Sequence, residues 1–189
     1  MNERRNRGET NVFVVVLIIA GLAAAAVFIA MLLKNSKYSE GAYDGNTYTN
    51  RWADIKVSLP SDYKIDHEKN TDSQTSRYFT NPAGTEIFGI CTMKGDTSVD
   101  QGLDTIRNTV ISGLSGTAYG YGLIADDVRD ETIAGREYRC LPMQVGDENV
   151  TMFINFYACR INKNGVMLFC IAGMSGDDIS RMLNYISKR

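Results

Sequence analysis

The sequence predicts an α+β domain, a sandwich around a mainly antiparallel sheet, carried behind one transmembrane helix. Three observations support this architecture. An uncharged apolar run covers residues 12–33, short strand patterns alternate with turn residues after residue 46, and amphipathic helix patterns lie at 97–114 and from Ser175 onward. The order of elements is four strands, a helix, four strands and a helix, which favours antiparallel hairpins.

Residues 12–33 form the first element and contain no charge, amide or hydroxyl. As a helix rising ~1.5 Å per residue, this run is about 33 Å long, enough to cross the ~30 Å hydrocarbon layer. A cleavable signal peptide has a shorter apolar region of about 7–15 residues. We therefore expect an uncleaved anchor that contacts the lipid bilayer.

The residues on either side of the span indicate its orientation. Three arginines precede it and two lysines follow it, a modest positive-inside signal, and a whole domain follows only one end. We expect a cytoplasmic tail at 1–11, a polar linker at 34–45 and an extracellular domain at 46–189. The predicted location is the cell membrane, with a single pass.

The charge balance argues against a nucleic-acid partner. Residues 38–189 carry 15 Lys+Arg and 20 Asp+Glu, a net charge of −5. In the sequence, the basic residues are scattered and show no footprint for nucleic acid or anionic lipid.

The strands are predicted from alternating apolar and β-branched residues that end at turn signals. Pro60 closes the second strand, Asn81 to Gly84 form a turn, and Ala134-Gly135 and Asn164-Gly165 close hairpins. The predicted strands are Thr47–Asn50, Ile55–Leu59, Ser76–Thr80, Glu86–Met93, Asp127–Thr132, Glu137–Val145, Val150–Ile161 and Val166–Ala172.

Each helix has a start signal and an apolar stripe. Thr97 and Asp100 resemble a capping box, and Ser175 precedes two aspartates in the first turn of the last helix. The apolar positions expected to be buried are Val99, Leu103, Ile106, Val110, Leu114, Ile179, Met182, Leu183 and Ile186.

The last hairpin is apolar on both faces. A two-residue turn at Asn164-Gly165 places Cys159 opposite Cys170 and Tyr157 opposite Ala172. A hairpin of this kind lies at the centre of a sheet that is covered on both sides, by the two helices and the early strands.

Four cysteines are present, at 91, 140, 159 and 170, and none forms a Cys-x-x-Cys pair. In an exported domain a Cys159–Cys170 disulfide is one alternative, and four small buried thiols are the other. Cys140 is expected opposite Asn155 and free.

No catalytic or metal constellation is recognisable. His67, the only histidine, is expected in a solvated loop, and no cofactor motif is found. Tyr119 and Tyr121, in the loop GTAYGYG, are the candidate partner contacts because tyrosine between glycines suits adaptable recognition. An ordinary mobile connection is the alternative interpretation.

The segment NTYTNRWADIKVSLPSDYKI resembles the opening of uncharacterised, membrane-anchored extracytoplasmic proteins of Gram-positive bacteria, especially clostridial ones. Tyr63 replaces the Trp usual in that pattern, and Ser61-Asp62 replace a small-Gly step. The pattern is matched by Asn46, Tyr48, Asn50, Ile55, Val57, Leu59 and Pro60.

These proteins resemble the PsbP-like fold, an α/β/α sandwich with a central antiparallel sheet. The resemblance implies a binding or assembly domain without catalytic activity, whose partner is an envelope protein of unknown identity. A small-ligand or metal-binding module, or a weak hydrolase, is the alternative function.

Overall fold

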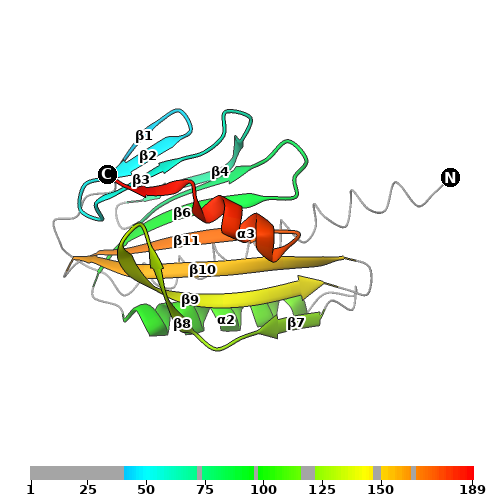
Figure 1. The fold of residues 1–189 in the computed structure, drawn as a ribbon. Coiled ribbons are helices and arrows are strands. Elements are labelled where there is room, and N and C mark those ends of the chain that lie inside the picture. Colours follow the sequence, from blue (N-terminus) through cyan, green and yellow to red (C-terminus); the bar gives the residue numbers. More distant parts are fainter. Residues whose placement is uncertain (1–40, 72–73, 96–97, 116–121, 147–149, 163–164) are drawn as a thin grey trace.

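The computed structural model describes residues 41–71, 74–95, 98–115, 122–146, 150–162 and 165–189 (Figure 1). In these ranges the helices are α2 (Val99–Ser115) and α3 (Gly176–Leu183). The strands are β1 (Ala42–Asp44), β2 (Thr47–Asn50), β3 (Ile55–Ser58), β4 (Lys64–Thr71), β5 (Gln74–Thr80), β6 (Ile87–Lys94), β7 (Gly122–Ala125), β8 (Arg129–Ile133), β9 (Arg136–Gly146), β10 (Thr151–Asn162), β11 (Gly165–Gly173) and β12 (Ile186–Lys188).

The strands form two antiparallel sheets. The larger has the order β4-β5-β6-β11-β10-β9-β7, and β8 also pairs with β9. The smaller has the order β1-β2-β3-β12, so that it joins an early hairpin to the last strand of the chain. The α+β class with a mainly antiparallel sheet is confirmed.

Both faces of the large sheet are covered. Helix α2 packs on one face, which we call the back face, through Leu103, Ile106 and Val110. The other face, which we call the front face, carries α3 and the small sheet. Both are drawn above and in front of the large sheet in Figure 1. The front cover is thus part helix and part sheet. Strand β11 is buried along its whole length, and this confirms the central hairpin predicted from its apolar faces.

Four strands were not predicted, each for a local reason. Strand β4 is mostly exposed and polar on both sides, because it is an edge strand, and it therefore lacks an apolar alternation. The short strands β7 and β12 lie in segments interpreted as a loop and as the end of a helix. Strand β1 falls within the predicted linker 34–45.

Two of the three predicted tight turns lie wholly within the described residues. Ala134 and Gly135 have φ of 50° and 77°, both left-handed, as a two-residue type I′ hairpin requires. The turn that begins at Asn81 is closed by a bond of 3.0 Å from the Gly84 N–H to the Asn81 carbonyl.

The predicted register of the last hairpin is wrong. Asn162 pairs with Gly165, and the register shifts again between Arg160 and Asn162, so the strands slip by three residues from the predicted pairing. Cys159 therefore faces Met167 and Cys170 faces Phe156. An odd slip reverses the faces, because side chains alternate along a strand.

The slip places Cys159 in the front core and Cys170 in the back core, so the proposed disulfide between them is excluded. All four cysteines are free and buried. Cys140 lies opposite Tyr157 and not Asn155 as predicted.

Within the described ranges, none of the helices is both long and apolar enough to cross a membrane. The predicted span, residues 12–33, lies outside those ranges.

Candidate functional site: a cleft beside helix α3

The covers of the front face leave part of the large sheet open. A cleft of about 320 Å³ lies there, between α3 on one side and β8 on the other. Strands β9 and β10 form its floor, which is visible between α3 and β8 in Figure 1. Its lining residues are Asp126, Arg129, Glu131, Pro142, Met143, Gln144, Phe153, Asn155, Tyr157, Gly176, Ile179, Ser180 and Leu183.

The floor presents neutral hydrogen-bonding groups among apolar ones. The Asn155 amide donates to the Tyr157 hydroxyl at 2.7 Å. Burial raises the pKa of Tyr157, and it raises the pKa of the neighbouring Cys140 thiol to about 12. Both groups therefore remain protonated at neutral pH, and the floor carries no charge of its own.

The β8 wall carries the charge of the cleft. The Arg129 guanidinium donates from Nε to the Glu131 carboxylate at 2.8 Å, and this hydrogen bond raises the pKa of Arg129. Asp126 adds a second carboxylate to the lining. Two carboxylates and one guanidinium give the lining a net charge of −1.

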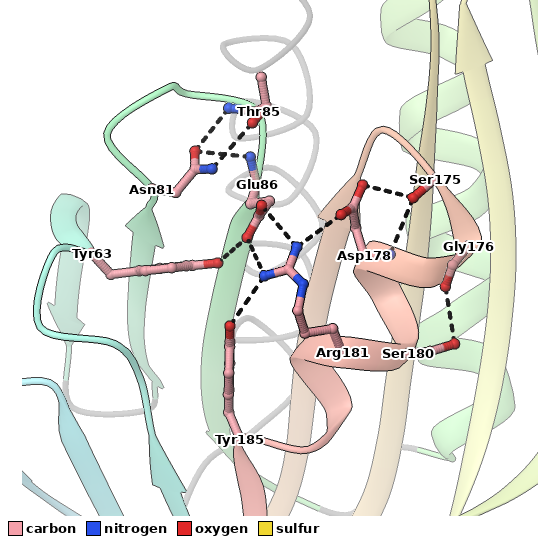
Figure 2. Close-up of polar contacts among 10 residues, drawn as sticks. All are labelled: Tyr63, Asn81, Thr85, Glu86, Ser175, Gly176, Asp178, Ser180, Arg181 and Tyr185. Atoms are coloured by element: carbon pink, nitrogen blue, oxygen red, sulfur yellow. Dashed lines mark hydrogen bonds and ion pairs between the residues drawn. The ribbon is translucent and has the colours of Figure 1, made fainter.

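The α3 wall begins at a side-chain cap. Ser175 is the N-cap, and its Oγ accepts from the Asp178 N–H at 3.2 Å while donating to the Asp178 carboxylate at 2.8 Å (Figure 2). Gly176 and Ser180 follow on the cleft side, where the Ser180 hydroxyl donates to the Gly176 carbonyl at 3.0 Å.

A network around Glu86 holds the helix against the sheet. Arg181 donates to both carboxylate oxygens of Glu86, at 2.9 and 3.3 Å, and also to Asp178 at 2.8 Å (Figure 2). Tyr63 donates its hydroxyl to the same carboxylate of Glu86. Glu86 lies just before β6, so these contacts join α3 to the middle of the large sheet.

The same contacts set the protonation of their members. The hydrogen bond to Glu86 is the largest cause of the raised pKa of Arg181, and burial is the largest cause of the raised pKa of Tyr63. Burial alone raises the pKa of Asp178, but hydrogen bonds from Ser175 and Arg181 outweigh it and lower the pKa overall. The network therefore persists as an ion pair at neutral pH.

The Asn81 turn supports Glu86 from its own strand. The Asn81 side-chain oxygen accepts from the N–H groups of Thr85 and Glu86, at 2.9 and 3.2 Å. These two hydrogen bonds fix the backbone just before β6, at Glu86, whose carboxylate holds α3. The α3 wall is therefore tied to the large sheet through Glu86.

Neither the two candidate contact residues nor the histidine is among the described residues that line the cleft. Tyr119 and Tyr121 fall outside the described residues. His67 lies in β4, not in a loop, with its ring centroid 6.2 Å from that of Tyr78. Across the described ranges, no three His, Cys, Asp or Glu side chains are grouped so that they can hold a metal ion.

The cleft residues themselves were missed. A usable signal was present, because Asn155 and Gln144 are amides with apolar neighbours on either side in the sequence. Residues of this kind in a doubly covered sheet mark a position that the cover does not reach. The sequence gives no indication of how far apart α3 and β8 lie.

Comparisons with known proteins bear on the fold. No known family and no curated protein matches the chain. The solution structure of the cyanobacterial PsbP protein CyanoP from Synechocystis is similar, with a TM-score of 0.52 and 11% identity over 82% of this chain and 98% of that one.

Two other solved structures have lower TM-scores. A Bacteroides thetaiotaomicron protein has a TM-score of 0.45 at 16% identity over 77% of this chain, which spans only 48% of that one. LpqN, involved in cell envelope biogenesis of Mycobacterium tuberculosis, has a TM-score of 0.33 at 10% identity over 70% of this chain and 82% of that one. The likeness to CyanoP, together with the antiparallel sheet and its two helices, shows a PsbP-like fold.

Proposed function

We propose that this protein is a non-catalytic, membrane-anchored binding domain on the extracellular side, and that it holds a segment of a partner protein in the cleft beside α3. The observation that carries the proposal is the cleft itself. It is about 320 Å³ in volume, and its walls and floor bring apolar and polar groups together.

The lining indicates what the segment must look like. Phe153, Ile179 and Leu183 offer an apolar contact for one aliphatic or aromatic side chain. Asp126 lies at the β8 side and favours a basic group beside that anchor. We therefore expect a partner segment with a Lys or Arg next to a large apolar residue.

The location rests on the sequence. An apolar run at residues 12–33 supports a single-pass anchor with the N-terminus in the cytoplasm and the C-terminal domain in the extracellular space of the envelope. The partner is then another envelope protein. The PsbP-like fold is compatible with this role but does not identify it.

A small-molecule ligand is the second candidate. The cleft volume of about 320 Å³ is at the lower end of the ~300–1,000 Å³ typical of small-molecule sites. A metabolite with a positive charge and an apolar part would suit the same lining.

Site-specific photo-crosslinking in intact cells tests the first proposal. A photoreactive side chain at Ser180, which is exposed on the cleft wall, should capture a discrete protein. The same group at Lys64, exposed on edge strand β4, should not capture it.

A substitution that blocks the cleft, paired with the same substitution elsewhere as a control, extends the test. A Cβ at Gly176 meets nothing within 4 Å, so Gly176→Phe adds a ring at the cleft without a clash at its base. Gly113 in α2 is equally open, and Gly113→Phe adds the same ring far from the cleft.

Gly176→Phe should abolish the Ser180 crosslink, and Gly113→Phe should preserve it. If no protein is captured while a metabolite raises the melting temperature of the purified protein, and Gly176→Phe removes that shift, the small-ligand function replaces the one proposed.

A further inference from the structure

The first described residue, Gly41, is held against the small sheet. Gly41 precedes β1 with φ of +83°, and a Cβ there would lie 2.6 Å from ring atoms of Tyr48. Its backbone therefore packs directly on that ring. Ala42 pairs with Thr49, which places Gly41 beside the turn that follows β2.

That turn presents the only tryptophan of the chain. The Asn50 side-chain oxygen accepts from the N–H groups of Trp52 and Ala53 at 2.9 and 3.0 Å, and this fixes the turn. The Trp52 side chain is nevertheless 46% exposed. The Arg51 guanidinium lies 5.8 Å from its ring centroid.

Strand β12 brings basic residues to the same end. Lys188 pairs with Ile55, and the Arg189 N–H donates to the Asp54 carbonyl at 3.1 Å. Figure 1 shows the C-terminus beside the ends of β2 and β3. We call Arg51, Trp52, Lys188 and Arg189 the anchor-end patch; all four are exposed.

The patch differs in charge from the rest of the domain. Its three basic side chains are accompanied by one carboxylate, that of Asp54, which lies 3.5 Å from the Lys188 ammonium. The side chains of the patch together with Asp54 sum to +2, whereas the side chains of residues 38–189 sum to −5. The sequence shows only scattered basic residues; the β3–β12 pairing brings these together.

The length of chain before Gly41 limits where this end can be. Residues 34–40 separate the predicted span from Gly41, and at about 3.5 Å per residue they reach no more than about 28 Å. A domain of this size is about 40 Å across, from a radius of gyration of about 15 Å. The end that carries Gly41 is thus the end held nearest the bilayer.

We propose that the anchor-end patch docks on the membrane surface, with Trp52 in the interfacial layer and the three basic side chains on anionic lipid headgroups. This inference rests on the anchor part of the proposed function and not on the cleft. Tryptophan is enriched at membrane–water interfaces, and basic side chains are attracted to anionic lipid headgroups. Each basic residue near an anionic surface favours the docked state about fivefold.

The full chain, reconstituted in vesicles, tests the proposal through its own fluorescence. Because Trp52 is the single tryptophan, the emission reports this position alone. In vesicles with phosphatidylglycerol in phosphatidylcholine, the emission should shift to shorter wavelength and be quenched by brominated lipid. Pure phosphatidylcholine vesicles, or 1 M salt with its Debye length of about 3 Å, should largely remove both effects.

Three variants give the controls. Arg51→Gln/Lys188→Gln/Arg189→Gln should lose the shift, through a change of about a hundredfold in the ratio of docked to undocked protein. Arg51→Lys/Lys188→Arg/Arg189→Lys keeps the charge and should keep the shift. Lys64→Gln removes an exposed charge from β4 and should leave the shift unchanged.

The outcomes separate the two proposals. Flotation of the protein with vesicles in high salt reports the anchor, and its loss refutes the proposed location. With the anchor intact, an emission that is insensitive to lipid charge and unquenched overturns the docking proposal. So does a shift that depends on protein density but not on lipid composition, since that indicates a protein contact.

Discussion

The two faces of the large sheet are closed in different ways. One helix of 17 residues covers the back face and leaves a cavity of only about 20 Å³ beneath it. The front face is covered by the 8-residue α3 and by the small sheet, and beside α3 a cleft of about 320 Å³ remains. When two separate elements cover one face of a sheet, part of that face can remain open to solvent. The candidate site lies at such an opening, beside α3.

The largest expected effect comes from the closed face. Leu103→Ala, at a residue 1% exposed beneath α2, should lower the free energy of unfolding by about 2–5 kcal/mol, because it removes buried methyl groups and leaves a cavity. Leu183→Ala on the half-buried cleft wall should cost less than half as much. Urea unfolding of both variants measures this; equal losses would mean that the cleft wall is packed like the back core.

One buried cysteine on each face allows the solvent access of the two faces to be compared. Burial raises the pKa of Cys91 on the back face and Cys140 on the front face to about 12, against about 8.5 in an unfolded chain. Above pH 8.5 the unfolded chain loses thiol protons that the folded chain keeps. Stability therefore falls as pH rises, by about 2 kcal/mol per thiol between pH 8.5 and 10.

Unfolding at pH 7, 9 and 10 should show this loss, and Cys91→Ala and Cys140→Ala should each reduce it by a similar amount. If Cys140→Ala leaves the pH dependence as it was, water from the cleft reaches the front thiol.

A smaller effect is expected on the cleft floor. Tyr157→Phe removes the hydroxyl that accepts from the Asn155 amide at 2.7 Å, and should cost about 0.5–1.5 kcal/mol. Tyr138→Phe, on the same face, is the matched comparison because its buried hydroxyl makes no hydrogen bond in the described part of the chain. Thermal unfolding of the pair should show Tyr157→Phe as the more destabilising.

The smallest effects belong to the ion pairs of the two cleft walls. A double-mutant cycle of Glu86→Gln and Arg181→Gln should give a coupling energy of about 1 kcal/mol or less, because the Arg181 side chain is 48% exposed and screened by solvent. The Arg129–Glu131 pair, whose arginine is 59% exposed, should couple still more weakly. The reverse order would place the firmer wall at β8.

The sequence predicts the parts of this fold that bury a periodic apolar face. Strands β10 and β11 and helix α2 have that pattern, and each was located to within two residues. The register of the last hairpin was not predictable, because Asn162 pairs with Gly165 and a further shift follows near Arg160, and neither leaves a trace in the apolar pattern. Edge strand β4 was not predicted because its side chains are mostly exposed and therefore show no apolar alternation.

The candidate site was less predictable than the fold. Asn155 is recognisable as an amide among apolar neighbours, but the cleft above it depends on the separation of α3 from β8. These elements are about 45 residues apart in the chain, and local patterns do not fix their distance.

The pairing of β12 with β3 has a consequence for biosynthesis. The two strands are joined by contacts such as the Ser187 hydroxyl to the Lys56 carbonyl, which are 131 residues apart. While the chain is being made, β3 presents an unpaired edge, and that edge is a template for pairing with other chains. The small sheet is complete only after β12 has left the ribosome, so its assembly comes late relative to the synthesis of β1–β3 and is slowed by the long sequence separation.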